Sequence, residues 1–300
     1  MVRTWLSKYS ETLGRYTMVG CLAIFGCVAA SASSILGSAQ NFAVLGHETV
    51  TNTGPTSIYG NVGVSPGTSI TDAVEITLKQ PGSSIHLNDG VAQQALIDEI
   101  AAYNSLSSLT STGILLDQLG GLSQPVYAGV YNFASTAHLT GTLTLDAQND
   151  PNARFVFRIP DTLTLASSAV VVVVNGGSNN SIFWQVGSSA TLGTSSVFAG
   201  NILALASVTL NTNASILCGR AFAQTGAVTL DTNVISADCN SYSPNNGLGA
   251  RSDFGSLGFS GVAAVPNSPE PGTLWLFGGV FVLGVTFQSA QNFRKTRRAV

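Results

Sequence analysis

The middle of the chain repeats itself with a period of about 20 residues, a length typical of stacked coils. Thr-Leu pairs begin at positions 144, 164, 191, 209 and 229, and most neighbouring pairs are separated by one such period or slightly less. Glycine, asparagine and aspartate separate these short alternating segments. Such a period with such corners is typical of a β-solenoid, in which each coil holds about three short strands. The repeat therefore predicts a stack of coils rather than a layered globular domain.

Alternation along the strands assigns the side chains of the repeat to two faces. The leucines are expected to point inward: Leu145, Leu165, Leu192, Leu210 and Leu230. The threonines are expected to point outward: Thr144, Thr164, Thr191, Thr209 and Thr229. Because stacked strands lie about 4.8 Å apart, these threonines are predicted to form one straight row. Thr194, Thr212 and Thr232 are expected beside it at the corners, and the direction of Thr51 and Thr53 stays open.

One segment departs from the strand pattern. Residues 89–106 place apolar side chains at helical spacing, and Asp89 is a suitable N-cap. A lone helix must bury its apolar face, so it is predicted to lie along one flank of the solenoid. The apolar run Val170–Val174 is predicted to be buried on both sides, beneath this helix.

The two ends of the chain are predicted to be targeting segments. Residues 1–32 combine Arg3, Lys8 and Arg15 with an apolar run, which indicates a signal peptide, an uncleaved membrane anchor being the alternative. At the other end, residues 269–300 hold Pro269, Glu270 and Pro271, an apolar stretch at 273–287 and a basic tail. This order resembles a PEP-CTERM sorting signal, which implies an exosortase-type processing enzyme as a partner, a membrane anchor, and a destination in the cell envelope or extracellular matrix. A plain single-span anchor predicts nearly the same location. Residues 241–268, rich in Gly, Ser, Asn and Pro, are expected to be a flexible linker.

The cysteines and charges narrow the chemistry. Cys218 and Cys239 are separated by roughly one coil of the repeat, so an exported domain can join them in a disulfide. Two isolated cysteines and three unpatterned histidines predict no metal site. Residues 33–268 hold five basic and thirteen acidic residues, a balance that argues against nucleic acid as a partner.

Several motifs in fixed order carry a family resemblance over about residues 35–237. They are Leu36–Val44, Thr51–Gly54, Gly60–Gly67, Pro125–Tyr131, Leu143–Ala147, Phe183–Gly187 and Gly200–Ala204. They resemble the microbial ice-binding (antifreeze) protein family. The resemblance implies an all-β dominated domain at 33–240: a right-handed, discontinuous parallel β-solenoid of triangular cross-section with one long α-helix packed alongside. It also implies adsorption to ice crystals, inhibition of ice growth and recrystallisation, and no cofactor. The family's Thr-(Ala/Gly)-x-(Thr/Asn) pattern is not kept at Thr194–Val197 or Thr212–Ser215.

Two other functions compete with an ice-binding threonine face. Parallel β-helices also host polysaccharide-cleaving enzymes, which need clustered carboxylates. Asp146 and Asp231 are expected at equivalent corners, although aspartate there also serves turns. A surface adhesin that binds polysaccharide is the second alternative. It would display aromatic side chains, and either Phe183 or Trp184 is expected to face outward. On balance the sequence predicts a binding protein, not an enzyme.

Overall fold

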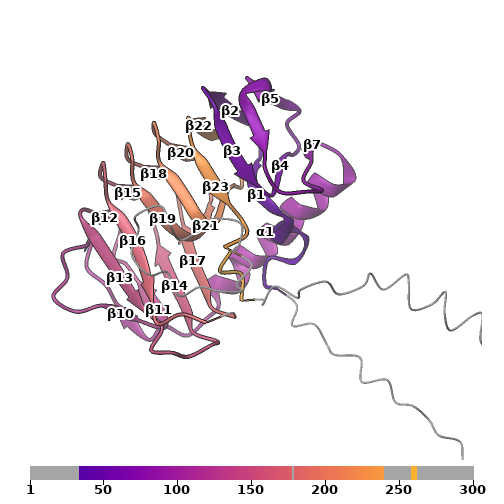
Figure 1. Cartoon of the computed structure of the whole chain (residues 1–300). Coiled ribbons are helices and arrows are strands. Elements are labelled where there is room, and N and C mark those ends of the chain that lie inside the picture. The colour runs from indigo at the N-terminus through magenta and orange to yellow at the C-terminus, as the bar shows by residue number, and fades with distance from the viewer. Residues whose placement is uncertain (1–33, 178, 240–257, 262–300) are drawn as a thin grey trace, which may run out of the picture. The chain divides into compact units, whose positions relative to one another are not determined.

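The computed structural model describes residues 34–177, 179–239 and 258–261 (Figure 1). The predicted signal peptide and the segment 269–300, with its motif Pro269-Glu270-Pro271, lie outside these residues. In the described ranges, none of the helices combines the length and the apolar character that a membrane span requires.

Short parallel strands stack into a coil with three sides, which confirms the predicted β-solenoid (Figure 1). One side is an eight-stranded sheet, here named the threonine sheet. In spatial order its strands are β5 (Ser69–Thr71), β2 (Thr49–Thr53), β22 (Val228–Asp231), β20 (Val208–Leu210), β18 (Ala190–Leu192), β15 (Leu163–Leu165), β12 (Ala137–Leu139) and β9 (Gln118–Leu119).

A 15-stranded sheet forms the other two sides. The side facing the helix, here the helix side, contains β7 (Ile85–Leu87), β4 (Asn61–Val64), β1 (Phe42–Gly46), β21 (Ser215–Ala223), β19 (Val197–Ala204), β17 (Ser181–Val186), β14 (Arg154–Ile159), β11 (Gly129–Asn132) and β8 (Gly113–Ile114). The third side contains β6 (Ile76–Leu78), β3 (Thr56–Tyr59), β23 (Val234–Ser236), the first halves of β21 and β19, β16 (Val170–Val174), β13 (Thr142–Asp146) and β10 (Val126–Tyr127). Strand β19 belongs to both sides because Val197 pairs with β16 while Asn201–Ala204 pair with β17. The short helix η1 (Gly37–Asn41) precedes β1, and η2 (Ala73–Glu75) connects β5 to β6.

The stack is discontinuous in sequence, as the family resemblance implies. The N-terminal strands β1, β2 and β3 pair with β21, β22 and β23 near the end of the domain. Thr51, for example, lies opposite Thr229. The first coils of the chain therefore extend a stack whose other coils come from residues 113–236 (Figure 1).

Leucine and other apolar side chains fill the interior of the coil. All five leucines predicted to point inward are buried, with at most 2% of their surface exposed. Burying one such side chain stabilises the fold by roughly 1.5–3 kcal/mol. The repeat period thus sets the core, because every second residue of each strand adds to the same interior column.

Aromatic rings stack through the middle of this interior. The ring centroids of Phe157 and Trp184 are 4.0 Å apart, and Trp184 is 5.1 Å from Phe198. Trp184 also donates its indole N–H to the carbonyl of Ala199 at 3.1 Å. Phe183 faces outward from the coil, as expected of one of the two residues, but the helix covers it, so neither Phe183 nor Trp184 is exposed to solvent.

Helix α1 spans Gly90–Ser107 and lies along the helix side (Figure 1). The Asp89 side chain caps it by accepting hydrogen bonds from the amides of Val91 and Ala92, at 3.1 and 2.9 Å. The buried face consists of small residues, one leucine and one acid: Ala92, Ala95, Glu99, Ala102 and Leu106. Bulkier side chains of the predicted apolar face, such as Ile97 at 59% exposure, point to solvent. Small side chains let the helix approach the sheet closely.

The prediction for Val170–Val174 is also wrong. Val171 and Val173 are buried, but Val170, Val172 and Val174 are partly exposed on the third side. This strand pairs with β13 and β19 and does not lie under the helix. An unbroken apolar run here reflects a β-branched strand with one open face, since valine favours strands whichever way it points.

Glu99 is a carboxyl group enclosed between the helix and the sheet. It is fully buried, and Gln224 donates a hydrogen bond to its Oε1 at 3.0 Å. Its Oε2 has no hydrogen-bond partner among the described residues. Desolvation raises the pKa of Glu99 to about 8, partly offset by the bond from Gln224. The group is therefore largely protonated at neutral pH.

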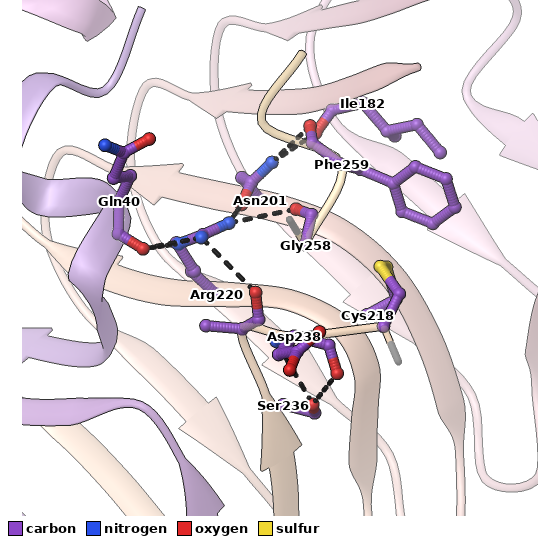
Figure 2. Close-up of a disulfide and its surroundings, with 11 residues drawn as sticks. Gln40, Ile182, Asn201, Cys218, Arg220, Ser236, Asp238, Gly258 and Phe259 are labelled. Carbon is purple, nitrogen blue, oxygen red and sulfur yellow. Dashed lines mark hydrogen bonds between the residues drawn. A yellow bond between two sulfur atoms is a disulfide. The ribbon is translucent and has the colours of Figure 1, made fainter. Parts of the chain in front are cut away.

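Near the end of the domain, Cys218 and Cys239 form a disulfide whose Cα atoms are 4.8 Å apart. Beyond it, Gly258–Gly261 return to the solenoid and pack against it, with Phe259 fully buried (Figure 2). These four residues fall within the segment predicted as a flexible linker, and for them that prediction is wrong. Buried apolar surface at Phe259 explains the difference, because a linker has none to bury.

Candidate functional site

The threonine sheet carries a straight row of outward threonines at the centre of its strands. Register places six of them opposite one another, here named the threonine row. In spatial order they are Thr71, Thr51, Thr229, Thr209, Thr191 and Thr164. His138 and Gln118 continue the same line to the far edge of the sheet. With strands about 4.8 Å apart, six threonines extend over about 24 Å.

Four of the five threonines predicted for this row lie in it: Thr164, Thr191, Thr209 and Thr229. Thr144 does not, because β13 belongs to the third side, where Thr144 lies opposite Val172. The position expected for Thr144 is held by His138, which pairs directly with Thr164. The Leu-Thr-Leu motif occurs on two sides of the coil, so the motif alone does not specify the side.

Two members of the row go beyond the prediction. Thr51, whose direction the sequence leaves open, points outward with the row, and Thr71 extends it by one more strand. A signal for Thr71 exists in the sequence, because Ser69-Ile70-Thr71 follows Thr49-Val50-Thr51 after one period of the repeat. This match fits the length of the coil, although the Thr-Leu pair itself is absent there.

Five of the six row threonines, all except Thr71, are held by buried neighbours. The residues before and after each of the five along its strand point inward, as Val208 and Leu210 do on either side of Thr209, and both are fully buried. The threonines themselves are partly exposed, and Thr71 is exposed. Two residues earlier on the strands, the outward positions hold small side chains: Ser69, Thr49, Ala227, Ser207, Ser189 and Thr162. The centre of the sheet therefore presents small uncharged side chains on a hydrogen-bonded backbone.

The corner beside the row follows a different order from the predicted one. Thr194 and Thr212 stack as expected, since the Ser195 amide bonds to the Thr212 carbonyl at 3.0 Å. In the next coil Asp231 occupies the equivalent position, as shown by the hydrogen bond of 3.1 Å from the Asn213 amide to the Asp231 carbonyl. Thr53 pairs with Asp231 and completes the line.

Thr232 is therefore not equivalent to Thr194 and Thr212, and its prediction is wrong. It stands in a column of left-handed residues with positive φ: Ser168 (59°), Ser195 (56°), Asn213 (60°), Thr232 (55°) and Gly54 (68°). The corner that holds Thr232 is one residue shorter than the two before it, which moves Thr232 into this column. The hydroxyls of Thr212 and Thr232 both donate to the Asp231 carboxylate, so they are engaged within the protein.

The two aspartates considered as a possible catalytic pair, Asp146 and Asp231, bond to residues of their own corners. Asp146 accepts from the Gln148 amide at 2.8 Å and from the Asn175 side chain at 2.8 Å, at the end of β13. Asp231 ends a strand of the threonine sheet, so the expectation that Asp146 and Asp231 occupy equivalent corners is wrong. Within the described ranges, no three His, Cys, Asp or Glu side chains group as a metal site would require.

Comparisons with known proteins agree on one family. Residues 44–236 match the family described as Ice-binding-like. The ice-binding protein of Nostoc sp. (strain HG1) is 52% identical over 211 residues, which cover 70% of this chain and 76% of that one. Ice-binding protein 1 of Shewanella frigidimarina is 31% identical over 230 residues, covering 67% of this chain and 25% of that longer protein.

Solved structures give the same answer. The ice-binding protein of the Antarctic ascomycete Antarctomyces psychrotrophicus has a TM-score of 0.63 and 37% identity, covering 68% of this chain and 98% of that one. An ice-binding protein from an Antarctic biological consortium has a TM-score of 0.64 and 39% identity, covering 69% and 92%. With the family match over most of the described solenoid, the chain belongs to the Ice-binding-like family.

Proposed function

We propose that this chain binds ice through the threonine row, and that adsorption there inhibits ice growth and recrystallisation. The observation that carries the proposal is the row itself: six aligned threonines on a parallel sheet, in a chain whose relatives are named ice-binding proteins.

Spacing suits the row to an ordered layer of water. Parallel strands repeat about every 4.8 Å, and outward residues along one strand repeat about every 6.6 Å. Both repeats are comparable to the separations of oxygen atoms in ice, so bound water can adopt positions close to those of the crystal. Each threonine contributes a hydroxyl that anchors a water molecule and a methyl group that limits the water's freedom.

Stiffness adds to the match in spacing. Threonine is branched at Cβ and has few χ1 rotamers, so little side-chain entropy is lost when the surface orders water. The backbone beneath is fixed by parallel pairing on both sides of each central strand. Within the row, threonine carries no charge that would hold its own hydration shell.

The corner line is assigned a lesser role. Thr194 is exposed next to the row and can extend it, but the Thr212 hydroxyl is already donated to Asp231. A carboxylate in the line also keeps tightly bound water of its own. The corner therefore marks the border of the ice-binding surface, with the row as its centre.

Two double variants test this proposal with a matched control. Thr191→Tyr with Thr209→Tyr places bulk in the middle of the row, whereas Thr142→Tyr with Thr144→Tyr makes the same change on the third side. Recrystallisation inhibition by residues 33–262 should be lost in the first and kept in the second, with unchanged circular dichroism in both. Equal loss in both pairs, or activity retained by the first, contradicts the assignment of the row.

We further propose that residues 1–32 export the chain and that residues 269–300 act as a PEP-CTERM-type anchor handled by an exosortase-type enzyme. The order of Pro269-Glu270-Pro271, an apolar stretch and a basic tail supports this. Deleting 269–300 should release the protein into the medium, as cell fractionation would report. A deletion variant that stays with the envelope would refute the anchor.

We also propose that the chain acts without catalytic chemistry or a cofactor. The turn roles of Asp146 and Asp231 support this reading. The burial of Trp184 and Phe183 likewise removes the aromatic platform that the polysaccharide adhesin was expected to use. Incubation with soluble polysaccharides should therefore yield no cleavage products, and an increase in reducing ends would contradict the proposal.

A further inference from the structure

Gly258–Gly261 pack against the corner between the helix side and the third side. The amide of Ile182, at the start of β17, donates to the carbonyl of Phe259 at 3.0 Å, and the Gly261 amide donates to the Asn180 carbonyl at 3.2 Å. Ser181 and Ser260 form an antiparallel bridge between these bonds. Phe259 enters the main interior cluster with no exposed surface. The segment thus supplies backbone pairing and core packing to strand β17.

Two buried polar side chains hold the segment from the other side (Figure 2). Asn201 donates to the carbonyls of both Ile182 and Phe259, at 3.0 and 2.8 Å. Arg220, only 1% exposed, donates to the Gly258 carbonyl at 3.0 Å and to the Asn201 side chain at 2.8 Å.

The same guanidinium joins the segment to the N-terminal part of the domain. It donates twice to the carbonyl of Gln40, at 3.0 and 2.6 Å, and once to that of Ala237 at 3.4 Å. A buried charge is costly unless its donors are satisfied, and these carbonyls accept from Arg220 beside the favourable charge of Asp238. One side chain therefore ties η1, the chain after β23 and Gly258 together.

The backbone conformation of Gly258 and Phe259 depends on the contacts that the segment makes at this corner. Gly258 has φ of 60°, and a Cβ there would lie 2.5 Å from both the Ala237 carbonyl oxygen and Arg220 Nη1. Phe259 has φ of 52°, a conformation that a bulky residue rarely adopts. Strain of this kind persists only where surrounding contacts hold it, and burial of the ring with the two carbonyl bonds provides such contacts.

The corner that receives the segment is opposite the threonine sheet. Each coil has three sides, and β19 passes from the third side to the helix side at this corner without entering the threonine sheet. Gly261 therefore lies at the edge of the coil farthest from the threonine row. The family match ends at residue 236, so this segment is an addition to the matched region.

We propose that Gly258–Gly261 are a clasp, which fixes the C-terminal chain to the corner opposite the threonine row and so directs the row away from the point of attachment. The role of the clasp rests on the proposed function, whereas the contacts that form the clasp do not. The residues bound at this corner belong to the same chain, and Asn201, Arg220 and the buried surroundings of Phe259 hold them there.

Hydrogen exchange on the full chain tests the clasp, with mass spectrometry of peptides covering residues 180–187 and 258–261. Phe259→Ala and Gly258→Ala should each speed exchange in these peptides by about tenfold or more, because local opening then breaks fewer contacts between the segment and the corner. Ser260→Ala is the control in the same segment. Its hydroxyl has no hydrogen-bond partner among the described residues, so exchange should stay at the parent rate.

Peptides from the threonine sheet, and recrystallisation inhibition, should be unchanged in all three variants. Parent-like exchange in Phe259→Ala would overturn the clasp. Faster exchange throughout the solenoid would instead make Phe259 an ordinary core residue, and protection that rises with protein concentration would mean that another copy supplies the segment. If the exchange pattern holds but no variant or parent acts on ice, the proposed function fails and the clasp stands.

Discussion

Replacing Glu99 with glutamine is predicted to stabilise the domain at neutral pH. The carboxyl group is fully buried between helix and sheet and has a pKa of about 8, against 4.5 for the ordinary group. Because the folded pKa is raised, the stability that Glu99 contributes is complete below pH 4.5. It is then lost as the pH rises toward 8, at about 1.4 kcal/mol per pH unit.

This slope sets the size of the effect. At pH 7 the folded protein must keep a proton that the unfolded chain releases, which costs about 3 kcal/mol relative to pH 4.5. Glutamine is neutral at every pH and keeps an oxygen that can accept from Gln224. The variant and the parent should therefore be about equally stable at pH 4.5 and differ by about 3 kcal/mol at pH 7, with the variant more stable.

Urea unfolding of residues 33–262, followed by circular dichroism at pH 4.5, 6, 7 and 8, would measure this difference. Glu75→Gln is the matched control, because Glu75 is exposed and its substitution removes no buried carboxyl group. A Glu99→Gln variant that is less stable than the parent at pH 7 would refute the reasoning. So would a difference that does not grow with pH.

Three further changes should act on stability in defined directions. Asp98→Asn should act in the opposite direction to Glu99→Gln and destabilise the domain at neutral pH. Burial works to raise the pKa of Asp98, but hydrogen bonds from Ser38 and Gln94 outweigh burial and lower this pKa. The stability that Asp98 contributes is therefore present above the ordinary pKa and is lost as the pH falls. The same urea series would show Asp98→Asn less stable at pH 7, and a variant as stable as the parent there would count against these bonds. Replacing Cys218 and Cys239 together with serine should lower the free energy of unfolding by about 3 kcal/mol, since the bond closes a loop with a sequence separation of 21. Thermal unfolding with and without reductant checks this, and reductant should not affect the variant. Leu210→Ala should cost about 2–5 kcal/mol by leaving a cavity in the coil, whereas Leu205→Ala, at 41% exposure, should cost much less.

The repeat predicted the solenoid and most of the threonine row, but not the assignment of every strand to a side. Coils in this protein differ in length. The separation in sequence between His138 and its partner Thr164 is longer than that between Thr191 and its partner Thr209. Thr144 precedes Thr164 by one ordinary period of the repeat and therefore imitates a full coil, although the two belong to different sides. Only strand register distinguishes the two possibilities, and register depends on loops whose length follows no period.

The helix was likewise predicted in part from the sequence. Its extent was predicted within one residue of Gly90–Ser107, because capping and helical spacing are local properties. The face that contacts the sheet was predicted only in part: Ala95, Leu96 and Tyr103 of the apolar pattern pack there, but Glu99 is buried with them while Ile97 and Ile100 remain exposed. The clasp was missed for a related reason: a Gly- and Ser-rich sequence predicts a linker, and one buried phenylalanine within it gives no periodic signal.

The junction between Thr51 and Thr229 also bears on how the domain folds. Strands separated by almost the whole domain must meet before β2 and β5 can join the row. Contacts of such long sequence separation require closure of a large loop and are associated with slow folding. During synthesis the coils containing Thr164, Thr191 and Thr209 can stack as they emerge, while the N-terminal coils wait for residue 229 and its neighbours. The two threonines made first, Thr51 and Thr71, are thus expected to be the last to take their places in the surface.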